Sequence, residues 1–163
     1  MTTNTSNDAY DQASAQMDSI IAMVNALQCD YETLQDLQDI KDSLCNGESL
    51  LPADSAQLDE LLAEANGCID SEDALTHILE DALSVEVRSD WAVAGEPLEA
   101  SEFAILLCTG GPAVRIRGEL SEHGEPARAW LEYQDWGTPW MEYHGDNAAQ
   151  QCLLAYAACF LFV

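Results

Sequence analysis

The chain has 163 residues, of which 30 are Asp or Glu and only five are Lys or Arg, giving a formal net charge of −25 at pH 7. Such a chain lacks the cationic side chains that neutralise phosphates, which excludes direct binding to nucleic acid and to anionic membranes. Because 48% of its residues are hydrophobic, it can bury a core and does not belong to the disordered class.

The N-terminal half has the periodicity of helices. Residues 7–46 contain neither Pro nor Gly, and their apolar residues recur at alternating spacings of three and four, which is typical of a heptad seam. The spacing shifts near Cys29–Tyr31, so this segment is one long helix or two helices that meet there. Further helices are predicted over residues 53–65 and 72–83. We expect residues 1–84 to form an acidic helical domain, whose seam allows a homodimer or closure within one chain.

From Ser84 onward the period of the apolar residues changes to two. Strands are predicted over residues 85–91, 103–108, 114–120 and 127–135, and a final helix over residues 146–162. Short turns between the last three strands indicate an antiparallel arrangement. We therefore expect residues 85–163 to form a second domain with an antiparallel sheet of about four strands and a C-terminal helix, so that the fold class is α+β.

The negative charge is concentrated in the helical part. Residues 1–84 hold 18 acidic residues and one Lys, whereas residues 85–163 hold 12 acidic residues and four Arg. Carboxylates three or four residues apart on a helix lie about 5–6 Å apart at Cβ, a spacing comparable to that of backbone phosphates. The candidate partner-binding residues form a first set and a second patch: Glu32, Asp36, Asp39 and Asp42; and Asp59, Glu60 and Glu64. A solvated helix face and adaptation to high salt are the alternatives.

Catalytic and metal-binding motifs are weak in this sequence. The six Cys are scattered without a Cys-x-x-Cys pair, which predicts reduced, mostly buried side chains and no zinc or redox site. We expect no enzymatic activity, metal or cofactor. Glu142 and His144, two residues apart, form the one acid–base pair that would support a catalytic alternative. The aromatic loop of residues 133–140 is a binding surface or closes the end of a sheet and covers a core.

The first 19 residues lack a cationic start and an apolar run, and no segment approaches the roughly 18 apolar residues of a membrane span. These features predict a cytoplasmic protein that does not enter a membrane.

Two segments of the C-terminal half carry a resemblance: residues 105–116 (ILLCTGGPAVRI) and residues 131–140 (LEYQDWGTPW). Over about residues 85–163 the chain resembles an uncharacterised module of small proteins from bacterial prophages and integrative mobile elements. That module has no assigned activity, so the resemblance implies only a context. Small acidic proteins of mobile elements are often inhibitors of host defence, including anti-CRISPR proteins, and several are similar to DNA in charge.

Charge and context together predict an anti-CRISPR protein that acts as a nucleic-acid mimic in the bacterial cytoplasm. Its partner would be a CRISPR effector complex or another basic nucleic-acid-binding protein, whose positively charged channel the acidic helices would block. The alternative is an acidic helical adaptor or antitoxin-like protein that neutralises a basic partner without mimicking DNA.

Overall fold

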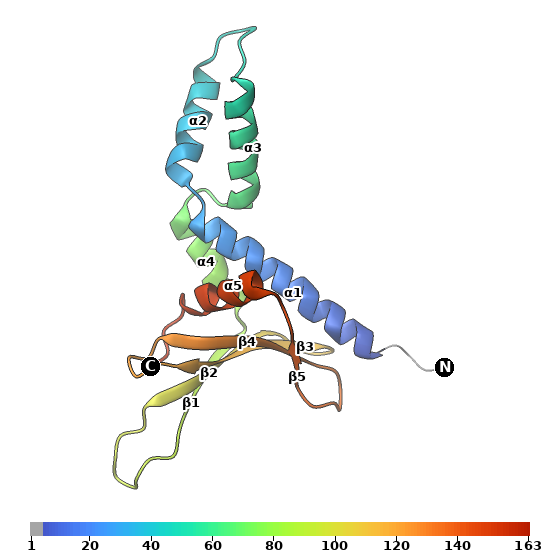
Figure 1. Ribbon diagram of the computed structural model, residues 1–163, viewed down its shortest axis with the longest axis vertical. Helices are drawn as coiled ribbons and strands as arrows, with labels where there is room; N and C mark the ends of the chain where they lie inside the picture. The colour runs from blue at the N-terminus through green and yellow to red at the C-terminus, as the bar shows by residue number, and fades with distance from the viewer. Residues whose placement is uncertain (1–4) are drawn as a thin grey trace. The chain divides into compact units, whose positions relative to one another are not determined.

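A computed structural model describes residues 5–163, which form five helices and one five-stranded sheet (Figure 1). The elements in chain order are α1 (Thr5–Gln28), α2 (Tyr31–Ser43), α3 (Pro52–Ala65), α4 (Ser71–Asp81), β1 (Ser84–Ser89), β2 (Ala100–Cys108), β3 (Ala113–Leu120), β4 (Pro126–Gln134), β5 (Met141–Tyr143) and α5 (Asn147–Ala157). The α+β class and the order of helices before an antiparallel sheet are confirmed.

The predicted count of about four strands is wrong, because the described residues contain a fifth strand, β5. This strand has only three residues and pairs with β4 through Leu131 opposite Tyr143 and Tyr133 opposite Met141. A strand of three residues is too short for its alternation of apolar and polar residues to be recognised in the sequence. The predicted C-terminal helix is also shorter than expected, since α5 ends at Ala157.

The chain divides into two compact units that are not continuous in sequence. One contains residues up to Ile21 together with Ile78–Val163, and the other contains Ala22–His77. The predicted division between residues 84 and 85 stays a prediction. Ala13, Met17 and Ile20 of the heptad seam are buried within the single chain, so this part of the seam does not require a second copy. A homodimer stays a prediction.

The helical segment predicted over residues 7–46 is two helices, and the break lies at Cys29 and Asp30. Asp30 caps α2, since one of its carboxylate oxygens accepts from the Thr33 backbone N–H at 3.1 Å and the other from the Thr33 hydroxyl at 2.7 Å. These hydrogen bonds hold the pKa of Asp30 below its ordinary value. The Tyr31 hydroxyl also donates to the Ala26 carbonyl at 2.7 Å, which joins the two helix ends.

Helices α2 and α3 form a hairpin, and their apolar sides share one core (Figure 1). The buried residues of this core are Cys29, Leu34, Leu37, Leu58, Leu61 and Ala65. Pro52 begins α3, where its missing N–H costs nothing, and Asn66 ends the helix in the left-handed conformation with φ of 50°. The local stop and start signals therefore fix the length of the hairpin.

The sheet has the strand order β1-β2-β3-β4-β5, and every neighbouring pair is antiparallel. Alternate residues of β2, β3 and β4 are buried, including Phe103, Ile116 and Leu131. α5 packs against β4 and buries Leu153 and Tyr156. This alternation gives the sheet one core-facing side and one side that carries charged residues.

The charged side of the sheet holds all four Arg of the chain, and each pairs with a Glu. The Arg115–Glu132 and Arg128–Glu119 pairs span 2.7 and 3.4 Å, and Arg88 and Arg117 both contact Glu102. The Arg115 guanidinium also lies 3.9 Å from the centroid of the Trp140 ring. Trp140 of the aromatic loop therefore covers an arginine. All four Arg side chains of this unit therefore form ion pairs with Glu side chains of the same sheet.

Gly118 provides a test of the sheet core. It lies opposite Phe103 in the β2–β3 pair, and a Cβ at this position would overlap the Phe103 ring and the Arg128 carbonyl oxygen. We expect Gly118→Ala to lower the free energy of unfolding by about 1–3 kcal/mol, as overpacking of a core does. The matched control is Gly111→Ala, because a Cβ there meets nothing within 4 Å. Urea denaturation measures both variants, and equal effects would contradict the close approach at Gly118.

Candidate functional site

The acidic residues of α2 that were predicted to bind a partner are all exposed. Leu34 and Leu37 are buried and define the side of α2 that faces α3. Since successive residues of a helix are about 100° apart around its axis, Glu32, Asp36 and Asp39 lie on the opposite, outward side. Asp42 lies beside this row, close to the end of the helix. We call Glu32, Asp36 and Asp39 the α2 row.

The second predicted patch is divided by the geometry of α3. Glu60 and Glu64 are exposed and four residues apart, so they share one flank of the helix beside the buried Leu61, and we call them the α3 row. Asp59 lies on a different flank, where it lines a hollow at the end of the hairpin. Both rows are exposed on the hairpin, whereas the apolar inner sides of α2 and α3 cover each other.

Cationic side chains do not interrupt the α2 row. Lys41 is the only Lys or Arg among residues 22–77, and it lines the same hollow as Asp59. Within the part of the chain that the structure describes, none of the seven predicted residues forms an ion pair. Asp39 accepts one hydrogen bond, from the Gln35 side chain at 2.8 Å. The α2 row therefore presents carboxylates that form no ion pair with a Lys, Arg or His of residues 5–163.

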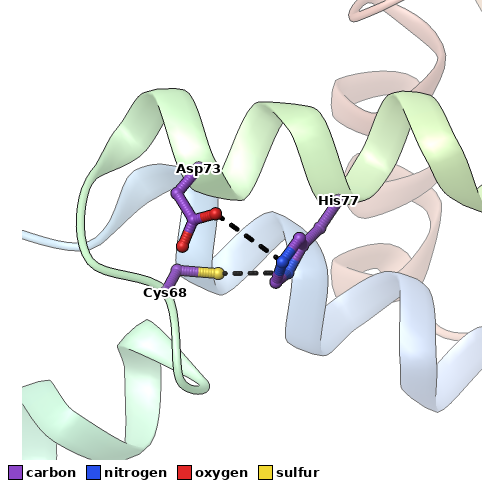
Figure 2. Close-up of side chains that lie close together, drawn as sticks. All are labelled: Cys68, Asp73 and His77. Atoms are coloured by element: carbon purple, nitrogen blue, oxygen red, sulfur yellow. Dashed lines mark hydrogen bonds and ion pairs between the residues drawn. The ribbon is translucent and has the colours of Figure 1, made fainter.

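The structure also assembles a cluster that the sequence analysis missed, made of Cys68, Asp73 and His77 (Figure 2). Asp73 and His77 are four residues apart on α4, and Cys68 belongs to the turn that precedes this helix. The distance from Cys68 Sγ to His77 Nδ1 is 3.4 Å, and the distance from His77 Nε2 to Asp73 Oδ1 is 3.7 Å. A search for Cys-x-x-Cys pairs cannot find this set. The spacing of Asp73 and His77 on a predicted helix was the available signal.

Two hydrogen bonds from backbone N–H groups to side-chain carboxylates hold the turn that carries Cys68. The Ile69 N–H donates to Asp73 Oδ2 at 3.0 Å, and the Asp73 N–H donates to Asp70 Oδ1 at 2.8 Å. Cys68 itself is buried with Ala26 and Ala74 in a small apolar cluster. The thiol is therefore fixed in place, while the Asp73 and His77 side chains are 32% and 52% exposed.

The order thiol, imidazole, carboxylate matches that of a nucleophile, its base and an orienting group. However, burial raises the pKa of the Cys68 thiol and the Asp73 carboxylate raises it further, although a hydrogen bond with Tyr31 acts in the opposite direction. A reactive cysteine instead needs surroundings that stabilise its thiolate. The raised pKa of the Cys68 thiol therefore argues against a role as a nucleophile.

The structure also brings together the pair considered for acid–base catalysis. His144 Nδ1 lies 3.9 Å from Glu142 Oε1, at and just after β5. Both side chains are exposed, and they are open to bulk water. General acid–base catalysis needs a positioned substrate within hydrogen-bonding reach, and this open position does not provide an enclosed site.

Comparison with known proteins identified no matching protein family, no matching curated protein and no matching solved structure. Among the helices of residues 5–163, none combines the length and the apolar character that crossing a membrane requires.

The unpaired carboxylates predict that salt stabilises the protein. Raising the ionic strength from about 0.01 M to about 0.15 M shortens the Debye length from about 30 Å to about 8 Å, which screens repulsion between surface charges. We expect the Tm to rise by about 2–4 °C, the shift that about 1 kcal/mol produces in a chain of this size. Thermal unfolding followed by circular dichroism measures it. The double variant Asp36→Asn/Asp39→Asn should show a smaller rise, and a Tm that is independent of salt would contradict the prediction.

Proposed function

We propose that the protein binds a basic nucleic-acid-binding protein through the α2 row and blocks its nucleic-acid channel as a mimic. The observation that carries this proposal is the unneutralised row itself. Residues 22–77 hold 13 acidic residues and a single Lys, and Glu32, Asp36 and Asp39 point outward together from one helix. An ordinary solvated face mixes charges of both signs.

The rigidity of α2 supports competition with nucleic acid. The helix holds its carboxylates at a spacing close to that of phosphates, so binding costs little ordering of the backbone. A basic channel attracts this row over a distance set by ionic strength, which accelerates association and makes it dependent on salt. Binding of the two ligands should be mutually exclusive because both require the same cationic groups of the partner.

A CRISPR effector complex of a bacterial host is the partner favoured by the resemblance of residues 85–163 to mobile-element proteins. Such complexes hold their heteroduplex in a positively charged channel and contact its backbone. An inhibitor that occupies this channel acts in the host cytoplasm and needs no catalytic group or cofactor.

The presence of a second acidic row, on α3, favours a second candidate function. An adaptor or antitoxin-like protein could use both rows to neutralise a basic partner that surrounds the hairpin, without resembling DNA. Competition separates the candidates. Excess DNA or RNA displaces a mimic from its partner, whereas an adaptor bound outside the nucleic-acid channel stays bound.

Charge reversal in the α2 row is the direct test. The partner is first captured from host lysate at low salt, identified by mass spectrometry and purified with and without its nucleic acid. We expect Asp36→Lys/Asp39→Lys to weaken binding at least about tenfold and to reduce its dependence on salt, because each change replaces an attraction worth up to about 1 kcal/mol by a repulsion. Titration calorimetry over a range of salt concentrations measures both effects.

The matched control is Glu96→Lys/Glu99→Lys, which changes the net charge equally in the exposed loop between β1 and β2. Equal weakening by both double variants would mean that net charge alone governs binding. A further variant, Glu60→Lys/Glu64→Lys, reverses the α3 row and measures whether the partner contacts that row as well. Binding that survives reversal of the α2 row would contradict the proposal.

A further inference from the structure

We propose that Cys68, Asp73 and His77 bind a divalent transition-metal ion, for which Zn²⁺ is the best match. This inference does not depend on the proposed function. One ligand atom from each residue lies within 4.8 Å of the other two. Thiolate, imidazole and carboxylate together form a ligand set that Zn²⁺ accepts, whereas Mg²⁺ and Ca²⁺ prefer oxygen alone.

The distances fit a tetrahedral ion. Bonds of about 2.0–2.3 Å to nitrogen, oxygen and sulfur place the ligand atoms of a tetrahedral site about 3.3–3.8 Å apart. The observed separation of Cys68 Sγ and His77 Nδ1 is 3.4 Å, so an ion can lie between these two atoms without movement of the backbone. Asp73 now faces the other ring nitrogen of His77, at 3.7 Å. Because Asp73 Oδ2 accepts from the Ile69 N–H, Oδ1 is the oxygen available to the ion, and a shift of this carboxylate would bring it there while water completes the fourth position.

The charge around the cluster also favours a cation. The Asp70 and Asp73 carboxylates lie in the turn and first turn of α4, and Asp70 is held there by its bond to the Asp73 N–H. No Lys or Arg occurs among residues 42–87, and no ion pair within residues 5–163 joins a Lys or Arg to Asp70 or Asp73. The exposed imidazole of His77 leaves an entry path from solvent, while the buried thiol provides the fixed ligand.

Such an ion would act as a structural clamp. It would connect the turn after α3, through Cys68, to two consecutive helical turns of α4, through Asp73 and His77. Because the ligands belong to the folded state, ion binding and folding of residues 22–77 would be coupled. The chain's free thiols require a reducing agent that does not itself bind metal.

Cobalt provides a direct spectroscopic test on the full chain. Metal-free reduced protein is titrated with Co²⁺ in excess Mg²⁺, which occupies surface carboxylates. We expect one Co²⁺ per chain with a thiolate-to-cobalt charge-transfer band and the intense visible bands of four-coordinate cobalt, all removed by Zn²⁺. A weak spectrum of six-coordinate cobalt without the thiolate band would overturn the proposal, because that is the signal of carboxylate and water ligands.

Matched variants assign the ligands. His77→Gln alters an exposed side chain and so leaves the fold intact, and we expect it to weaken Zn²⁺ binding by about 100-fold or more, as loss of a ligand must cost at least as much as loss of an outer-shell partner. Cys68→Ser should abolish the charge-transfer band. The controls Cys45→Ser and His123→Gln remove the same residue types elsewhere and should leave affinity and spectrum unchanged. A band that survives in Cys68→Ser, or equal losses in the controls, would place the ion elsewhere and overturn the proposal.

Discussion

The apolar contact between α2 and α3 is the constraint on which the acidic hairpin depends. Full burial of a leucine side chain contributes about 1.5–3 kcal/mol, and Leu34, Leu37, Leu58 and Leu61 are all buried in this contact. Two like charges about 6 Å apart in water repel by roughly 0.7 kcal/mol. The leucines therefore outweigh several such repulsions. They also decide which carboxylates point outward, since every residue not on the inner side of its helix faces solvent.

The two units handle charge in different ways. In the sheet unit, Arg88 and Arg117 share Glu102, while Arg115 and Arg128 have carboxylate partners of their own. In the hairpin, a single Lys near the end of α2 accompanies many carboxylates, and it lies outside the α2 row. The four Arg of the sheet unit pair with only three of its 17 acidic residues, so its net charge of −13 is close to the −12 of residues 22–77. We place the proposed binding surface on the hairpin because its carboxylates form a row on a helix that no Lys or Arg interrupts, and not because its net charge is larger.

Local signals in the sequence were sufficient for most helices and strands. Pro52 and Asn66-Gly67 bound α3 because their backbone preferences act within one turn, and the change of period at Ser84 coincides with the start of β1. The strand β5 was missed because three residues carry no period, and its pairing with β4 is a tertiary interaction. Exposure of the seven acidic residues followed from helical periodicity. The pairing of α2 with α3, which sets how the two rows are placed, could not be predicted, since it is a tertiary contact.

The cluster of Cys68, Asp73 and His77 also depends on a tertiary contact that the sequence does not reveal, and it connects the two proposals. Asp73 and His77 are paired by helical spacing, but only the turn after α3 brings Cys68 to them. That turn also determines the direction in which the chain leaves α3 and enters α4, within the unit formed by residues 22–77. A metal ion bound to Cys68, Asp73 and His77 would restrict this turn. Such an ion would stabilise the fold of residues 22–77, and with it the helices that carry the acidic rows, without contacting those rows.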